Sequence, residues 1–458
     1  MALKKTIIGS IDDQILRFTA GKDTKLDMNL VVVDCIGTAA HAKMLQKISK
    51  NNPIINEKEY DQIILILKSI INKRKANKFN IRLTDQDVHM AIERILTEEN
   101  SVIGKKIHTC RSRNDQVATD LRLYGKEQIL LTLLEATELI KTLLRFGKKH
   151  KSIPMVGRTH MQPGMPSSLG LWATAHAESL LDDCTNLLYA LDINDQCPLG
   201  SAASYGVSIN IDRNYTSKLL GFSKPTHNVL YANNSRGKIE GIIASALSQV
   251  MLSLSRFSQD LLLYTMPEFN YFNIPDIFCT GSSIMPQKNN LDICELIRAK
   301  ATRVKANELA IYDIVKNSPS GYNRDLQEAK QPFLECIDET RACLKVLSPM
   351  IDSLSINKTN LIESFSKEIF AADEALDLVF DGIPFRDAYN KVKEKLQDIE
   401  YIDPSEAILK KDHLGAPSGL DWSYFNLRVK EVNNLTQKAK RHYEKTISVL
   451  LEIDYKIG

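Results

Sequence analysis

Long segments without proline constrain the fold of this 458-residue chain more than any other feature. Proline interrupts helices because it lacks a backbone N–H and its ring clashes with the preceding turn. Segments without proline therefore permit long helices, and we expect long helices to dominate the fold. The four segments lie between these pairs of prolines: Pro53 and Pro154, Pro225 and Pro267, Pro286 and Pro319, and Pro349 and Pro384.

Apolar residues recur in these segments at helical spacing. From Asp115 to about His150 most of them lie three, four or seven positions apart, as an amphipathic helix requires. The same spacing predicts helices over 167–190, 238–264 and 291–315, each longer than the usual mean of about 11 to 12 residues. Alternation typical of strands is nearly absent, and 30–33 fits either a short strand or a buried helix turn. The predicted fold class is all-α.

Helices of this length also predict an oligomer with several domains. Helices of about 25 to 35 residues cannot all bury their apolar stripes in one small bundle, so a long bundle that continues into partner subunits is expected. Loop-like breaks at 103–109 and near 348–357 divide the chain. We expect an N-terminal helical domain (1–109), a central long-helix bundle (110–357) and a small C-terminal helical domain (358–458).

Charge and cysteine usage exclude several classes of protein. The net charge is only +3, from 59 basic and 56 acidic residues, so no nucleic-acid partner is expected. The start of the chain has no apolar signal region, and no segment approaches the length of a membrane helix. The eight cysteines form neither a C-x-x-C pair nor a cluster with histidine at zinc spacing. We therefore expect no metal, no disulfide scaffold, no membrane and a cytoplasmic protein.

Residues 281–290, G-S-S-I-M-P-Q-K-N-N, form the stretch most suggestive of chemistry. Glycine and paired serines give a mobile turn with exposed backbone N–H groups, while Lys288 and Asn290 can hold an anion by charge and hydrogen bonds. The stretch predicts a loop that binds a carboxylate. An ordinary polar loop before a helix is the alternative.

Three further stretches carry polar groups suited to anions or proton transfer. Residues 108–116, H-T-C-R-S-R-N-D-Q, crowd arginines at the start of a predicted helix, which favours carboxylate binding or, alternatively, a solvated helix cap. Residues 157–166, G-R-T-H-M-Q-P-G-M-P, place His160 in a proline-flanked loop, and histidine is the commonest side chain for passing a proton near neutral pH. Residues 321–330, G-Y-N-R-D-L-Q-E-A-K, fit either a binding element or a capped helix start.

Together the four stretches resemble the signatures of the fumarase/aspartase superfamily, and most closely those of the argininosuccinate lyase family. The resemblance covers nearly the whole chain, from 18–23 to 414–419. It implies a three-domain, all-α fold with a long central helical bundle shared between subunits. It also implies a homotetramer that acts on argininosuccinate without a cofactor. The chain departs from the family pattern at Gly21, Cys110, Leu291 and Ala329.

The implied reaction is the reversible β-elimination of argininosuccinate to L-arginine and fumarate, the last step of arginine biosynthesis. By resemblance Ser282 is the base, although Ser283 stays open, and His160 protonates the departing nitrogen with Glu295 orienting it. Lys288 would stabilise the negative charge that develops on the substrate. The expected substrate-binding residues are Ser112, Arg113, Asn114, Thr159, Asn290, Tyr322, Gln327 and Lys330.

Two other functions remain open at this point. One is a sister lyase acting on a different fumarate adduct such as adenylosuccinate, which the Y-N-R-D-L-Q element disfavours. The other is a noncatalytic structural protein like the lens crystallins on the same scaffold. The joint presence of Ser282, His160, Lys288 and Glu295 counts against this last alternative.

Overall fold

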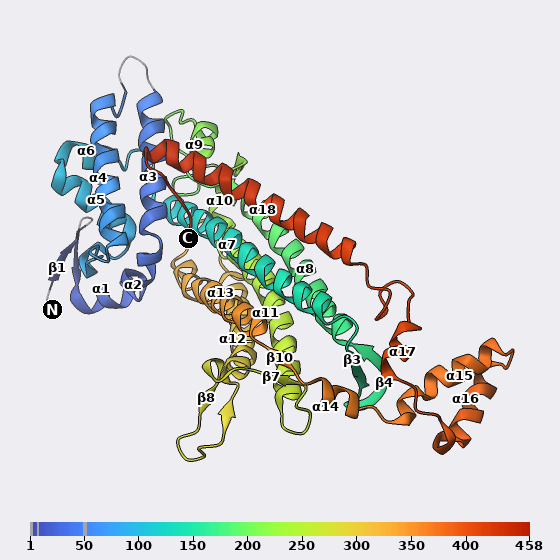
Figure 1. Ribbon diagram of the computed structural model, residues 1–458. Coiled ribbons are helices and arrows are strands. Elements are labelled where there is room, and N and C mark those ends of the chain that lie inside the picture. Colours follow the sequence, from blue (N-terminus) through green and yellow to red (C-terminus); the bar gives the residue numbers. More distant parts are fainter. Residues whose placement is uncertain (1–2, 7–8, 49–52) are drawn as a thin grey trace.

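The computed structural model describes residues 3–6, 9–48 and 53–458. Long helices run side by side and give the molecule an elongated shape (Figure 1). Most buried apolar residues belong to one continuous core that these helices share. The long helices are α7 (Arg113–Lys149), α8 (Leu169–Asn194), α11 (Lys238–Thr265), α12 (Asp292–Val315), α13 (Lys330–Asp352) and α18 (Trp422–Leu451).

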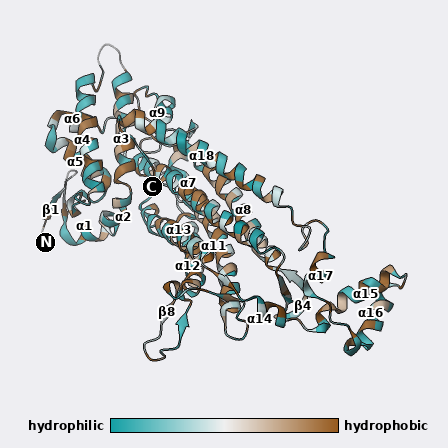
Figure 2. Cartoon of the chain, in the orientation of Figure 1, coloured by the Kyte–Doolittle hydropathy of each residue, from teal (hydrophilic) through white to brown (hydrophobic). Residues whose placement is uncertain are grey.

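The predicted all-α class is confirmed, and the four predicted long helices begin and end within a few residues of α7, α8, α11 and α12. The start of α7 has a local cause. Ser112 caps the helix, and its own backbone N–H donates to Asp115 Oδ1 at 2.9 Å, which completes a capping box. Hydrophilic and hydrophobic residues mix along the helices (Figure 2). In the described residues no helix is apolar over a length sufficient to cross a membrane.

The N-terminal part is a cluster of shorter helices packed against the start of α7. Residues 30–33 belong to a helix, because α3 begins at Val31. Helix α6 extends to Lys106, so the loop before α7 is shorter than predicted. The elements here are β1 (Leu3–Thr6), β2 (Gly9–Asp12), α1 (Asp13–Ala20), α2 (Asp23–Leu26), η1 (Asp27–Asn29), α3 (Val31–Lys47), α4 (Glu57–Lys75), η2 (Leu83–Asp85), α5 (Val88–Glu99) and α6 (Ser101–Lys106).

A β-hairpin after α7 was not predicted. Strand β3 (Pro154–Thr159) pairs with β4 (Gln162–Ser168), and prolines in both strands hide the alternation that normally marks a strand. Short elements connect the long helices elsewhere. They are β5 (Gln196–Cys197), α9 (Arg213–Leu219), β6 (Lys224–Pro225), α10 (Val229–Asn234), β7 (Phe272–Asn273), η3 (Asp276–Phe278), β8 (Thr280–Gly281), β9 (Asn289–Asn290), η4 (Arg324–Gln327) and β10 (Ser355–Ile356).

The predicted break near 348–357 is partly helical, because α13 continues through Pro349 to Asp352. A separate small core follows at the far end of the molecule, around Phe365 and Phe370. Helix α18 then returns to pack along α7. The three predicted domains stay a prediction. The remaining elements are α14 (Lys358–Glu363), η5 (Lys367–Phe370), α15 (Ala371–Phe380), α16 (Phe385–Glu394), η6 (Leu396–Asp398) and α17 (Pro404–Leu409).

Candidate active site

A polar cavity of about 110 Å³ lies where α7 begins. The first turn of α7, the 3₁₀ helix η4, the start of α13 and the first turn of α5 form its walls. Two of the stretches singled out in the sequence, about 200 positions apart, therefore meet in one place. The predicted substrate-binding residues that line the cavity are Arg113, Asn114, Tyr322, Gln327 and Lys330, and Ser112 caps the helix beside them.

Arg113 is held in place by a carboxylate on the neighbouring helix. Its Nε donates to Asp87 Oδ2 at 2.7 Å, and a second guanidinium nitrogen contacts the same oxygen. Asp87 also caps α5, since its Oδ1 accepts from the backbone N–H of Met90 at 2.9 Å. Although burial raises the pKa of Asp87, the charges of His89 and Arg113 outweigh it and hold the pKa below its ordinary value. Asp87 is therefore ionised and orients the Arg113 fork.

Lys330 lies at the base of the cavity between two carboxylates. Its side chain is 3% exposed, and its Nζ lies 2.5 Å from Asp27 Oδ1 and 3.1 Å from Asp23 Oδ2. Burial lowers the pKa of Lys330, but these two carboxylates reverse the shift and raise it. Burial raises the pKa of Asp23 to about 6, with Lys330 opposing that shift. Lys330 is thus a buried, paired cation on the cavity wall.

Besides the ion pairs of Lys330, the 321–330 stretch binds one backbone carbonyl of the N-terminal helices. The oxygen of Thr19 accepts from Gln327 Nε2 at 3.2 Å and from an Arg324 nitrogen at 2.6 Å. Arg236 donates to the carbonyl oxygen of Leu326 at 3.1 Å and lies over the Tyr322 ring, 6.0 Å from its centroid. Arg324 and Arg236 also line the cavity, so its walls carry several cations and amides together with the carboxylates of Asp23 and Asp87.

Thr159 and His160 lie elsewhere, at the tip of the β3–β4 hairpin. Both residues are exposed. His160 and Met161 have positive φ angles of 51° and 64°, as two-residue hairpin turns of type I′ require. Arg158, the residue before Thr159, anchors the hairpin close to its tip, because its guanidinium lies 4.8 Å from the centre of the Phe269 ring. The hairpin therefore presents the His160 imidazole outward, away from its own subunit's core.

Residues 282–288 form a largely exposed loop, here called the signature loop, which the short β8–β9 ladder closes. Ser282 Oγ accepts backbone N–H groups from Met285 at 3.1 Å and from Ile284 at 3.4 Å. Ser283 is exposed, whereas Ser282 is half-buried within the loop. Helix α12 begins directly after the loop. Lys288, Asn290 and Glu295 line one cavity of about 530 Å³ at this helix start.

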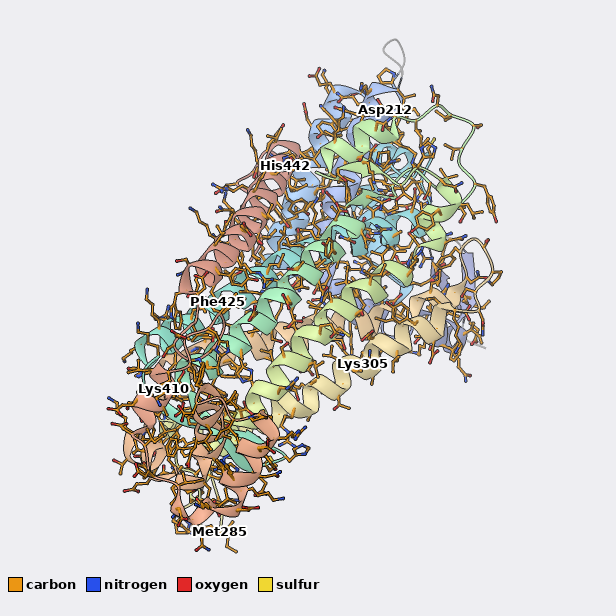
Figure 3. The ribbon with its side chains drawn as sticks, turned by 90° about the vertical axis from the view of Figure 1, so that its right-hand side faces the viewer. Asp212, Met285, Lys305, Lys410, Phe425 and His442 are labelled. Carbon is orange, nitrogen blue, oxygen red and sulfur yellow. The ribbon has the colours of Figure 1, made fainter. Side chains whose placement is uncertain are left out.

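Long helices separate these groups within one chain. Helix α7 has 37 residues and is therefore about 55 Å long, with Arg113 at its start and the His160 hairpin beyond its end. Helix α12 has 24 residues and is about 36 Å long, with the signature loop at its start and Tyr322 beyond its end. Met285, in the middle of the loop, lies at one end of the molecule (Figure 3). One chain thus brings together only part of the predicted site.

Three residues of the first cavity, two carboxylates and a histidine, were not predicted from the sequence. Asp87 and His89 line it from the first turn of α5, and Asp23 lines it from α2. The signal available was the run Asp87-Val88-His89 at the start of a helical segment, but nothing local connects it to the other stretches. One departure from the family pattern is explained. Cys110 has a φ of 62°, so the turn before α7 keeps a conformation that glycine adopts readily.

Comparison with known proteins agrees with this geometry. The sequence profile of a protein family described as lyase matches residues 14–306. The argininosuccinate lyase of Thermotoga neapolitana is 38% identical over 386 residues, which are 84% of this chain and 96% of the relative. The chain belongs to the argininosuccinate lyase family. The family assignment and the lyase class predicted from the motifs are thereby confirmed.

Solved structures confirm the fold of this family member. An EDDS lyase in complex with formate superposes with a TM-score of 0.81 at 19% identity, covering 96% of this chain and 94% of the other. A class II fumarase from Schistosoma mansoni gives a TM-score of 0.72 at 16% identity, covering 88% and 98%. At these identities the likeness concerns the fold alone, and it bears out the fumarase/aspartase-like architecture.

Proposed function

We propose that the chain catalyses the reversible β-elimination of argininosuccinate to L-arginine and fumarate, in arginine biosynthesis. The observation that carries the proposal is the cavity at the start of α7. Its Arg113 fork, Asn114 amide, Gln327 amide and Lys330 ammonium suit a substrate that bears three carboxylates. Asp87 and Asp23, on the same walls, suit its amine and guanidino groups.

The signature loop would supply the base. A serine hydroxyl is a poor base unless its alkoxide is stabilised. Two backbone N–H groups already donate to Ser282 Oγ, and their dipoles would stabilise negative charge on that oxygen. Lys288 lies six residues further along the same loop. After the Ser282 oxygen takes the β-proton, the electron pair spreads onto the adjacent carboxylate. Lys288, Asn290 and the start of α12 would stabilise this second negative charge.

His160 would complete the elimination as the acid. Cleavage of the C–N bond leaves the bonding electron pair on the departing guanidino nitrogen, and a proton from His160 binds to that pair and gives the guanidinium group of arginine. Glu295, in the first turn of α12, would orient that imidazole, and Thr159 would hold substrate beside it. These assignments need the hairpin, the loop and the α7 cavity to lie together.

Because helices of about 55 Å and 36 Å keep these groups apart in one chain, we propose that they meet between chains. A homotetramer in which each site takes the α7 cavity from one subunit and the hairpin and loop from others satisfies this condition. The grooved, exposed face of α11 and α12, which carries Leu252 and Leu309, is available for such contacts. All eight cysteines are free thiols, which supports a cytoplasmic location for the enzyme.

The test is a substrate panel. Purified protein is incubated separately with argininosuccinate, adenylosuccinate, malate and aspartate while fumarate absorbance is followed. Fumarate should form from argininosuccinate at a rate far above that from the other three, and the Ser282→Ala variant serves as the blank. Fumarate from adenylosuccinate alone would indicate a sister lyase, and no turnover of any substrate would indicate a noncatalytic relative.

A further inference from the structure

His89 is a fully buried histidine that the proposed reaction does not use. It lies in the first turn of α5, and its Nδ1 is 3.3 Å from Asp34 Oδ2 on α3 and 3.5 Å from Asp120 Oδ2 on α7. The three side chains are at most 2% exposed. None of these three atoms has a close hydrogen-bond partner within the described residues. The ring also lines the substrate cavity.

Charge balance decides the state of this cluster. Arg111 is a further cation beside this cluster. It donates to Thr38 Oγ1 at 2.9 Å, and that hydroxyl lies 3.4 Å from Asp34 Oδ1. Two buried carboxylates therefore face one guanidinium, and a buried charge without a partner is costly. One added proton makes the four groups neutral overall, and His89 Nδ1 is the site that lies between both carboxylates. Of the other carboxylates near the ring, Asp87 pairs with Arg113, and Asp27 pairs with Lys330, which it shares with Asp23.

The first turn of α5 supports two substrate-binding cations at once. Asp87 orients Arg113. The backbone N–H of Val88 donates to Asp27 Oδ2 at 3.2 Å, and the other oxygen of Asp27 binds Lys330. His89 is the next residue and connects this turn to α3 and α7. We infer that His89, held as an imidazolium between Asp34 and Asp120, is a positioning residue that fixes Arg113 and Lys330 for substrate binding.

The electrostatic environment supports a charged ring. Burial lowers the pKa of His89, but Asp34 and Asp87 outweigh that effect and raise it above its ordinary value. Burial and the adjacent Asp34 also raise the pKa of Asp120, well above its ordinary value. The cluster as a whole therefore retains protons more firmly than three separate groups would.

The kinetic test, which rests on the proposed function, compares two buried histidines. His89→Gln keeps the shape but not the charge. It should lower kcat/KM for argininosuccinate by about 10²-fold, as small misplacements of binding groups do, mainly through KM. The control is His41→Gln. His41 is also buried, its Nε2 lies 2.9 Å from the Thr109 oxygen, and burial and Arg111 lower its pKa to about 3, so that it is uncharged. The kcat/KM of His41→Gln should differ from that of the wild type by less than fivefold.

A second test needs no substrate and so stands apart from the proposed function. A histidine with a raised pKa stabilises the fold below its unfolded pKa, and this contribution is lost as pH rises through the folded value. The melting temperature of the wild type should therefore exceed that of His89→Gln most near pH 6, and the difference should shrink toward pH 9. His41, with a lowered pKa, should behave oppositely, because its contribution is lost as pH falls below about 6.5.

Three results would overturn the inference. One is a melting-temperature difference for His89→Gln that does not vary with pH or grows with it. Another is a fall in kcat/KM no larger than that of His41→Gln. The third is a stoichiometric divalent metal ion in the protein as purified that is absent from His89→Gln, because such an ion would replace the proton. Asp120→Asn provides a further check, since it should move the pH at which the difference fades to lower values.

Discussion

At the scale of single residues, the signature loop would stabilise the alkoxide of Ser282, the proposed base. Ser282 Oγ receives two backbone N–H groups from its own loop, at 3.1 and 3.4 Å. Such donors stabilise negative charge on oxygen, and they are fixed before substrate arrives. Ser283 is exposed. The geometry therefore favours Ser282 over its neighbour as the base.

Lys288 should matter more for turnover than for affinity. Its charge acts most strongly when the second negative charge develops on the substrate, so Lys288→Ala should lower kcat by about 10² to 10³ with a smaller change in KM. Steady-state kinetics of fumarate release measures both. Gln287→Ala, an exposed neighbour in the same loop, is the control and should stay near wild type. A loss in kcat below tenfold would mean that the lysine only positions the loop.

Ser282 and His160 should act on different bonds. Ser282→Ala should abolish exchange of the β-proton of argininosuccinate with solvent. His160→Asn should impair C–N cleavage yet leave some exchange, because the earlier proton transfer can still run backward. Deuterium incorporation into recovered substrate in heavy water reports each case. Exchange that survives in Ser282→Ala and disappears in His160→Asn would reverse the two roles.

At the scale of elements, periodicity predicted the long helices well and the hairpin not at all. Buried apolar residues at every third or fourth position place α7, α8, α11 and α12 within a few residues. The β3–β4 hairpin carries Pro163 and Pro166 and so lacks the alternation of a strand. Pro349 suggested a break, yet α13 accommodates it three residues before its end, where losing one N–H removes little helix. Local sequence patterns therefore predict the wrong element where a proline lies in a strand of this small hairpin or in the last turn of a helix.

The contact between α7 and α18 should depend on pH through Glu127. This buried carboxyl accepts from Tyr443 at 2.8 Å and from Tyr455 at 2.6 Å. Burial raises its pKa to about 7, although the two tyrosines oppose the shift. A carboxyl with a raised pKa makes the fold less stable as pH rises from its unfolded value, about 4.3, through 7.

Glu127→Gln removes this titration while keeping an acceptor for the tyrosines. The melting temperature of Glu127→Gln minus that of the wild type should increase as the pH is raised from 5 to 8. Thermal unfolding followed by circular dichroism at several pH values measures the difference. Glu135→Gln, on the same helix with its carboxylate paired to Arg341, is the control. A Glu127→Gln difference that stays constant or falls across this range would contradict the assignment.

At the scale of the whole molecule, the sequence predicted the site's parts better than their assembly. Arg113, Asn114, Tyr322, Gln327 and Lys330 do meet in one cavity. Their partners Asp27 and Asp87, and His89 beside them, come from η1 and the start of α5, so no motif within the predicted stretches marks them. The length of α7 and α12 keeps the other predicted site residues, His160 and Ser282 among them, away from that cavity within one chain. We therefore propose that the complete site lies between subunits.

The most direct test of this account is complementation between two inactive variants. His160→Asn damages the hairpin and Gln327→Ala damages the cavity, and each alone should cleave argininosuccinate at a small fraction of the wild-type rate. When the two are denatured together and refolded, some sites should combine an intact hairpin with an intact cavity, and fumarate release should recover to a substantial fraction of wild type. A refolded mixture as inactive as either parent, from a wild type that refolds to full activity, would contradict a site shared between chains.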